Sequence, residues 1–330
     1  MATSSFTSRL GSFGLALYAL FVLGCLLALY LPWPDSLAII PTITEFIPGW
    51  FVLLPAPLVI FFIRSRKQFV KLAMISLVSG VVFLDLQLPL SFATDNSGPQ
   101  LRIATYNVGN GPVHPDDLLD WYYRNEIDAL LVQETQAFEP GPYLPDDMHY
   151  VCGGRLCVIS HHPVDKMESL SRQAFKGGWG NYIARFDLQW NGASIAIYNV
   201  HLNTPRHELE FLRGLLPGVK KASRLYVLRK LESQIASAMV AQHPQRRRYT
   251  IIAGDFNLTP KGAIYREYWS DYSNAFSVAG IGTGYTKKTR LLGARIDHIL
   301  YDDSIRVAQV SVGDSLGGDH RPVMADLVLQ

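Results

Sequence analysis

The sequence has 330 residues, of which 48% are hydrophobic, so the chain is too apolar to be disordered and long enough for one large domain or two modest ones. Its 30 basic and 28 acidic residues nearly balance, which argues against a protein that binds nucleic acid through bulk charge alone. Three cysteines exclude a disulfide-dense scaffold and offer no zinc-finger spacing. The charges are unevenly distributed, because residues 1–92 carry only eight of them.

Three apolar runs predict a transmembrane anchor over residues 1–92. Residues 12–31 are twenty uncharged positions, residues 46–63 form a second run interrupted by prolines, and residues 69–90 form a third with charges near its ends. A helix of about 20 apolar residues can cross the hydrocarbon core of a bilayer. Buried core helices are one alternative, and three such runs in succession argue against them. A cleaved signal peptide is the alternative for the first run, but its apolar stretch is too long and no small-x-small cleavage site follows it.

The basic residues of this anchor predict its orientation. Residues 64–71 hold four of its five basic residues, whereas residues 32–45 hold none and carry two acids. The positive-inside rule therefore places residues 64–71 and the N-terminus in the cytoplasm. Three spans would place the rest of the chain outside the cytoplasm, and two spans would keep it inside. We expect a multi-pass membrane protein whose larger domain lies on the non-cytoplasmic side.

Two cysteines bear on the same question. Cys152 and Cys157 are separated by four residues and are placed to close a small loop disulfide in an oxidising compartment. They are equally compatible with two small apolar residues of a strand whose side chains point apart. The sequence leaves both interpretations open.

Residues 93–100 are small and polar and predict a linker, and residues 101–330 predict a formally neutral α/β domain with many short strands. The strands are expected at residues 101–108, 127–134, 155–160, 181–190, 193–202, 249–257, 295–302, 306–314 and 323–330. Helices are expected at residues 115–125 and 223–242, where apolar residues recur on one face.

Most of these expected strands end in a polar residue that can carry chemistry. These residues are Asn107, Glu134, Asn199, His201, Asp255, Asn257, Asp297, His298, Asp319 and His320. Any one of them is explained by a turn or a cap. Their recurrence predicts that they share one cleft.

The chemistry of this set points to phosphoester hydrolysis. Carboxylates and amides without a cysteine ligand set suit a hard cation such as Mg²⁺ or Mn²⁺. Imidazoles beside carboxylates transfer protons or donate to an anionic centre. Together they predict attack by a metal-activated water on a phosphoester. The sequence has no Walker-type phosphate loop and no G-x-G-x-x-G, so we expect no nucleotide cofactor.

The order of the motifs TYNVG, QET, GGRLCVISHHPV, YNVHL, GDFN, RIDHIL and GDHRPV resembles that of the endonuclease/exonuclease/phosphatase superfamily. The resemblance covers about residues 100–330. It implies the deoxyribonuclease I-like fold, a four-layered α/β/β/α sandwich with the active site at one end of the paired sheets.

The resemblance also implies a metal site. Glu134 resembles the principal metal carboxylate, Asn107 lies beside the metal, and Asp319 stands where a further metal-site acid is found. The serine that commonly precedes the final Asp-His pair is Gly318 here, which removes a hydroxyl but no ligand.

The remaining residues are assigned to catalysis and substrate binding by the same resemblance. Asp255 orients or deprotonates the attacking water, and Asn257 holds the phosphate. His320 contacts the phosphate and is oriented by Asp297. His201 stabilises or protonates the departing oxygen, with Asn199 shaping the substrate cleft beside it.

The sequence thus predicts a membrane-anchored, divalent-metal-dependent phosphoesterase, whose substrate is a lipid headgroup or another phosphoester outside the cytoplasm. The alternative is a metal-dependent nuclease acting on DNA. A non-enzymatic receptor or scaffold is disfavoured by the complete metal and histidine set. Basic residues in 220–248 and the mixed apolar and basic segment 211–221 suit either an anionic lipid surface or a nucleic-acid backbone. The oligomeric state is not predicted.

Overall fold

The structure is a computed structural model that describes residues 2–88, 98–109, 111–135, 140–175, 178–206, 215–242, 249–288 and 293–330. Most of the expected linker, the end of the third apolar run, and parts of the segments 211–221 and 220–248 lie outside the described residues.

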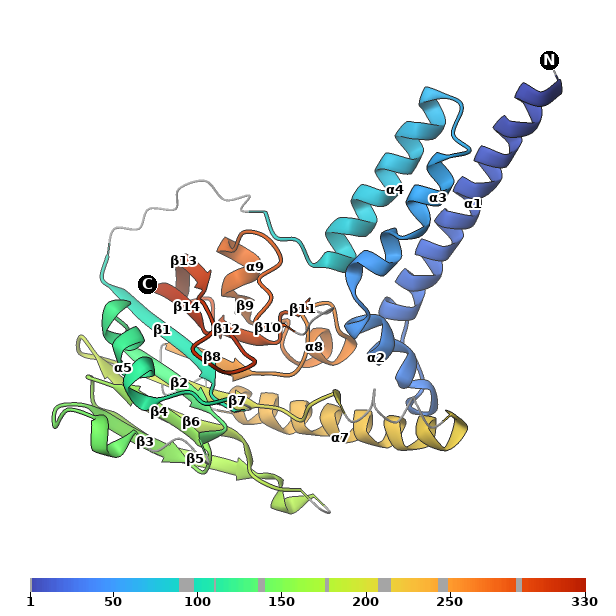
Figure 1. The fold of residues 1–330 in the computed structure, drawn as a ribbon. Coiled ribbons are helices and arrows are strands. Elements are labelled where there is room, and N and C mark those ends of the chain that lie inside the picture. Colours follow the sequence, from blue (N-terminus) through green and yellow to red (C-terminus); the bar gives the residue numbers. More distant parts are fainter. Residues whose placement is uncertain are drawn as a thin grey trace.

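Two six-stranded sheets form the larger domain (Figure 1). The first sheet has the order β13-β14-β1-β2-β4-β3, and the second has the order β5-β6-β7-β8-β12-β9. The strands of the first sheet are β1 (Gln100–Asn107), β2 (Ala129–Gln133), β3 (His149–Gly153), β4 (Leu156–Ser160), β13 (Ile305–Val312) and β14 (Val323–Leu329). Those of the second sheet are β5 (Val164–Ser171), β6 (Asn181–Trp190), β7 (Ala193–His201), β8 (Tyr249–Asp255), β9 (Ser273–Asn274) and β12 (Asp297–Tyr301). A short ribbon pairs β10 (Lys287–Lys288) with β11 (Gly293–Ala294).

The two sheets pack face to face because alternate residues of each strand are apolar toward the space between them. Along β1, Leu101 and Ile103 face the second sheet, whereas Ala104 and Tyr106 face outward. Helix α5 (Pro115–Arg124) covers the outer face of the first sheet. Helices α7 (Leu215–Ala241) and α8 (Ala263–Tyr268) cover the outer face of the second. The predicted α/β/β/α layering is therefore present.

All nine expected strands and both expected helices are found, with small differences in their ends. The sequence patterns missed β3, β5, α8, and α9 (Ala275–Ala279), together with short 3-10 turns at Gly141–Tyr143 and Arg172–Ala174. Strand β5 lies at the edge of its sheet, where three consecutive residues are exposed, so it lacks the apolar alternation of a half-buried strand. Helix α7 begins at Leu215, eight residues before the expected start.

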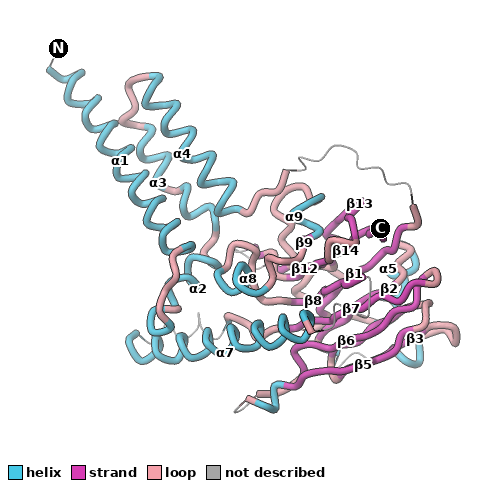
Figure 2. The backbone as a smooth tube through the Cα atoms, turned by 180° about the vertical axis from the view of Figure 1, so that it is seen from behind, coloured by secondary structure: helices cyan, strands magenta, loops and turns pink. Residues whose placement is uncertain are grey.

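A helical segment of residues 2–88 projects from one end of the sandwich (Figure 1). It contains α1 (Ala2–Tyr30), η1 (Asp35–Leu37), α2 (Ile39–Phe46), η2 (Gly49–Leu53), α3 (Pro55–Ile60) and α4 (Arg66–Leu84). Helices α1, α3 and α4 pack on one another, and the N-terminus and the α3–α4 connection lie at the end farthest from the sheets (Figures 1 and 2). We call residues 2–88 the N-terminal helical segment.

Two of these helical stretches, Arg9–Tyr30 and Arg66–Leu84, are long and apolar enough to cross a membrane. The expected second run, residues 46–63, is not one straight helix in the structure. Ile39–Phe46 and Gly49–Ile60 form a pair bent by 86°, which counts as a third span only if the pair is taken as one. Prolines explain the break, since they lack the amide hydrogen that a continuous helix requires.

Candidate active site

Parallel strand pairs bring the predicted site residues to one edge of the sandwich. Strand β1 runs parallel to β2, and β7 runs parallel to β8. The carboxyl ends of parallel neighbours meet at the same edge, so Asn107 and Glu134 converge from the first sheet, and His201 and Asp255 from the second. Strand β12 is antiparallel to β8, which places its first residue, Asp297, directly opposite Asp255.

Glu134, His201 and Asp255 form a compact group in which one ligand atom from each residue lies within 4.8 Å of the others. The Asn107 side-chain amide links the acids by donating to Glu134 Oε1 and Asp255 Oδ2, each at 3.0 Å. A side chain at Gly109 would place its Cβ 2.0 Å from Glu134 Oε2, so this position needs glycine. Two carboxylates and an imidazole are a donor set that fits a divalent cation.

Asp255, Asp297 and His320 form a second group of the same kind, and all three are almost completely buried. His320 Nδ1 lies 3.0 Å from both Asp297 oxygens, and His320 Nε2 lies 3.7 Å from Asp255 Oδ2. Burial alone would lower the pKa of His320, but the carboxylates of Asp297 and Asp255 outweigh it and raise the pKa to about 9. The two carboxylates thus favour the protonated form of His320, while the Lys287 ammonium disfavours it.

Burial and the neighbouring Asp297 carboxylate raise the pKa of Asp255 to about 7. The backbone amide of Asn257 donates to Asp255 Oδ1 at 2.9 Å. This carboxyl group is thus poised to exchange a proton near neutral pH, as a general base requires.

His201 lies at the edge of the site, with Nε2 3.4 Å from Glu134 Oε1. Burial and the nearby Arg172 guanidinium lower the pKa of His201 well below its usual value. Arg172 donates to the backbone carbonyl of His201 and pairs with the buried Glu232 at 2.8 Å. Sequence reasoning missed Arg172 and Glu232, because neither lies in a motif and their contact joins segments sixty residues apart.

Asn257 is buried and has a left-handed backbone conformation, with φ of 51°. Its side-chain amide donates to Leu202 O at 3.0 Å, and the residue lines the cavity described below. Its carbonyl accepts from Arg229 of α7. Asn257 therefore holds the loop after β8 in shape and also borders the space open to a substrate.

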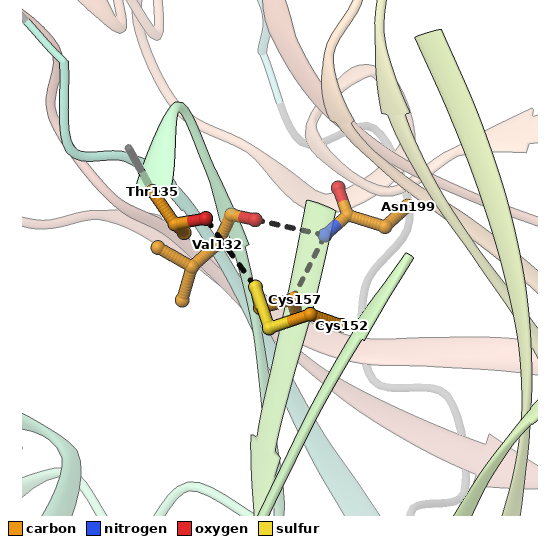
Figure 3. The surroundings of a disulfide bond; sticks show 5 residues. All are labelled: Val132, Thr135, Cys152, Cys157 and Asn199. Carbon is orange, nitrogen blue, oxygen red and sulfur yellow. Dashed lines mark hydrogen bonds between the residues drawn. A yellow bond between two sulfur atoms is a disulfide. The ribbon is translucent and has the colours of Figure 1, made fainter. Parts of the chain in front are cut away.

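Asn199, which was expected to shape the substrate cleft, has a side chain that lies between the two sheets with no exposed surface. Its amide nitrogen donates to Val132 O and Cys157 O (Figure 3). Its amide oxygen accepts from the side chain of Gln133. Every polar atom of this side chain is thus used to join β7 to the first sheet. Asn199 ties the sheets together behind the site.

Asp319 is in neither metal-type group of the described residues, and its Oδ1 lies 3.7 Å from His320 Nε2. Its Oδ2 pairs with Lys287 Nζ at 3.2 Å, while its Oδ1 is buried without a hydrogen-bond partner within the described chain. Lys287 Nζ also lies 2.8 Å from His320 Nε2. Lys287 was missed by sequence reasoning, since a lysine in the two-residue strand β10 belongs to no motif.

A cavity of about 450 Å³ opens onto this group. Glu134, His201, Asp255 and Asn257 form its acidic and polar floor, and its walls carry cationic and aromatic side chains. These wall residues are Arg155, Arg172, Trp179, Arg206 and Lys287. The Arg155 guanidinium lies 3.0 Å from the centroid of the exposed Trp179 ring. Cationic side chains beside a group that can hold a metal ion suit an anionic substrate.

Cys152 and Cys157 are disulfide-bonded and lie directly opposite each other on β3 and β4 (Figure 3). Of the two interpretations that the sequence left open, the structure has the loop disulfide. The bond lies behind the site, because Cys157 O accepts from Asn199 and Cys157 Sγ lies 3.4 Å from the hydroxyl of Thr135.

Comparisons with known proteins agree with this geometry. Residues 104–320 match the model of the Endonuclease/Exonuclease/phosphatase family. Among solved structures, truncated Caenorhabditis elegans TDP2 is similar, with 14% identity and a TM-score of 0.52 over 69% of this chain and 97% of that one. An AP endonuclease from Archaeoglobus fulgidus is similar with 16% identity and a TM-score of 0.51, over 68% of this chain and 98% of that one. No curated protein sequence matches. At these identities the structural similarity shows the fold alone.

Proposed function

The chain belongs to the endonuclease/exonuclease/phosphatase family and is a phosphoester-hydrolysing enzyme, and from this premise we propose that it is membrane-anchored, depends on a divalent metal and acts on a phosphoester at the membrane surface. The substrate class we favour is a lipid headgroup. The N-terminal helical segment supports the membrane part of the proposal, because large apolar side chains such as Leu20 and Leu77 are more than half exposed on its outer surface.

Glu134 would hold Mg²⁺ or Mn²⁺, oriented by the amide of Asn107 and assisted by Asp255 or the orphaned oxygen of Asp319. Such an ion would lower the pKa of a bound water and neutralise charge on the phosphate. Asp255 accepts the proton of the attacking water. Asn257 and the His320 imidazolium bind the phosphate oxygens.

His201 donates a hydrogen bond to the departing oxygen in this proposal. Its lowered pKa keeps the imidazole neutral at physiological pH, so it stabilises that oxygen without first carrying an extra proton. The Arg172 contact to its backbone fixes its place at the edge of the cavity.

The observation that carries the membrane-substrate proposal is the position of the site against the N-terminal helical segment. Asn257 lines the active-site cavity, and the backbone amide of Thr259, two residues later, donates to Glu45 Oε1 of α2. Lys287 lines the same cavity, and Arg295, on the other side of the β10–β11 ribbon, is ion-paired with Asp85 at the end of α4. A bilayer crossed by α1 and α4 would therefore lie beside the active site, where a lipid headgroup is within reach.

Two features support a site outside the cytoplasm. The N-terminus and the basic connection after α3 lie at the far end of the bundle from the catalytic domain (Figure 1). The Cys152–Cys157 disulfide is typical of an oxidising compartment.

A nuclease is the second candidate, favoured by the cationic wall of the cavity and the exposed Trp179, on which a base is able to stack. The N-terminal helical segment disfavours a long duplex, because it occupies the space beside the site.

The test is hydrolysis by the full-length chain in detergent or nanodiscs, with Mg²⁺ or Mn²⁺, on phospholipids with phosphodiester and phosphomonoester headgroups and on single- and double-stranded DNA. The proposal expects headgroup or phosphate release that EDTA abolishes, with DNA left intact. Cleavage of DNA alone would overturn the lipid assignment in favour of the nuclease. Metal-independent release would overturn the metal assignment.

A further inference from the structure

A buried carboxylate of the N-terminal helical segment contacts the active-site loop directly. Only three acids occur before residue 89, namely Asp35, Glu45 and Asp85. Asp35 is exposed, whereas Glu45, in the last turn of α2, is only 3% exposed. An acid buried to this extent needs partners that offset its desolvation.

Those partners belong to the loop that follows β8. Glu45 Oε1 accepts from the backbone amide of Thr259 at 2.8 Å and lies 3.3 Å from its hydroxyl. The carboxylate also fills the space above Gly262, where any Cβ would lie 2.4 Å from Glu45 Oε1. The loop thus receives this carboxylate with two donors and with a glycine at the position where a Cβ would displace it.

The same loop carries Asp255 and Asn257. Asn257 adopts a left-handed conformation, which is costly for a residue with a side chain and persists only where its surroundings hold it. Contacts from within the catalytic domain hold the first part of the loop: Ile296 O accepts from Phe256, and Leu258 O lies 2.9 Å from the His298 ring. The Thr259 amide instead donates to Glu45, which belongs to the N-terminal helical segment.

Arg229 extends this link. It is fully buried in α7, donates to Asn257 O at 3.3 Å and lies 3.4 Å from the hydroxyl of Thr42 on α2. Helix α2 therefore reaches the Asn257–Thr259 stretch both directly through Glu45 and indirectly through Arg229.

We propose that Glu45 is a positioning residue for catalysis: it fixes the Asp255–Thr259 loop in the geometry that aligns the catalytic carboxylate and amide. The kinetic part of this proposal rests on the proposed function. Removing the Glu45 carboxylate leaves the Thr259 amide without its acceptor, which loosens the loop. Because a small misplacement of catalytic groups slows a reaction strongly, the looser loop lowers the rate. The N-terminal helical segment is then part of the working active site as well as an anchor.

The test compares Glu45→Ala, Glu45→Gln and Gly262→Ala with the wild type, all as full-length chains in nanodiscs, with the exposed acid variant Asp35→Asn as the control. Hydrogen exchange is measured on peptides covering residues 252–262 and, as an internal reference, the β7 strand. Steady-state kinetics are measured on the phosphoester that the wild type hydrolyses.

Glu45→Ala is expected to speed exchange of the Thr259 amide by about tenfold or more while β7 is unchanged, and to lower kcat by about tenfold to a hundredfold with KM within about twofold. Glu45→Gln, which keeps an acceptor oxygen, is expected to retain most of kcat. Gly262→Ala, which displaces the carboxylate without removing it, is expected to behave like Glu45→Ala. Asp35→Asn is expected to match the wild type.

Unchanged exchange in residues 252–262, or an unchanged kcat in Glu45→Ala, would overturn the proposal. Faster exchange in β7 as well would show a general loss of stability and would also overturn a positioning role. If Glu45→Ala fails to fold, Glu45→Gln and Gly262→Ala carry the same comparison. A wild-type chain that hydrolyses no phosphoester would refute the proposed function, and the exchange measurement would still decide whether Glu45 holds the loop.

Discussion

His320 and Asp297 form the most enclosed ion pair of the active site, with Nδ1 3.0 Å from both carboxylate oxygens and both side chains at most 2% exposed. The pair is formed because Asp297 opens β12 opposite Asp255, while His320 reaches in from the loop before β14. This contact therefore governs the charge of the site beside Asp255.

The His320–Asp297 pair predicts how activity depends on pH. The pKa of His320 is raised to about 9, so its imidazole is protonated below that pH. Activity should therefore fall as the pH rises through about 9. Asp297→Asn removes the stabilising charge, so the alkaline limb of the kcat profile should move to lower pH and kcat at pH 8 should fall by about 10²-fold or more. A variant with the wild-type alkaline limb would contradict the assignment.

His298, the neighbour of Asp297, predicts a pH dependence of stability with the opposite sense. Burial and the Arg295 guanidinium lower its pKa to about 3, so the folded protein keeps it neutral while the unfolded chain protonates it near pH 6.5. The stabilisation is complete above about pH 6.5 and is lost as the pH falls toward 3. Between pH 6.5 and 5 the wild type should lose about 2 kcal/mol more than His298→Gln.

Thermal unfolding of the full-length chain at several pH values measures this difference. His149→Gln, at an exposed position of β3, is the matched control and should follow the wild type. Parallel curves for wild type and His298→Gln would show that His298 is not held neutral.

The disulfide predicts a stability that depends on redox state. Replacing Cys152 and Cys157 by serine removes a constraint on a short loop, which should lower the unfolding free energy by about 2 kcal/mol and loosen Asn199, whose amide donates to Cys157 O. Cys25→Ser, at the free cysteine of α1, should have no such effect. Peptide mapping without reductant should find the bond in protein taken from its native membrane, and free thiols there would contradict it.

Separating the catalytic domain from the N-terminal helical segment predicts a loss of stability. Arg229 and Arg295 are almost fully buried, and each contacts that segment, through Thr42 and Asp85 respectively. A chain of residues 98–330 would expose both guanidinium groups and leave Glu45's partner, Thr259, without its acceptor. We expect it to unfold at a lower temperature than the full chain and to aggregate more readily. Equal thermal stability of the two would show that the contact is weak.

The sequence was informative wherever function imposed a local pattern. Strands of the two inner layers could be predicted because burial on both faces makes them apolar. The convergence of the candidate site residues could be predicted because Asn107, Glu134, His201 and Asp255 stand at or just after strand ends, and Asp297 stands at the start of β12. Parallel pairing then brings the strand ends together without further information. The edge strand β5 could not be predicted, because its exposure removes the pattern.

Residues that act through tertiary contacts could not be found in the same way. Lys287, Arg172 and Glu45 lie outside every motif, and each reaches the site from a segment whose position depends on the completed fold. Asn199 was expected to shape the substrate cleft, but an amide at a strand end is also suited to joining two sheets in the core, and its side chain makes such contacts. The prolines of residues 46–63 were visible, but the sequence patterns did not predict the 86° bend between Ile39–Phe46 and Gly49–Ile60.

Glu134 carries the central claim, because every proposed step depends on the cation that its carboxylate would hold. The decisive measurement is the initial rate of phosphoester hydrolysis by the full-length chain and by Glu134→Gln, each with Mg²⁺ and with EDTA, and with thermal unfolding as the check on folding. The account predicts that Glu134→Gln keeps the wild-type fold and loses about 10²-fold or more of the metal-dependent rate, to the level that EDTA leaves. A folded Glu134→Gln chain that hydrolyses the substrate at the wild-type rate would contradict it.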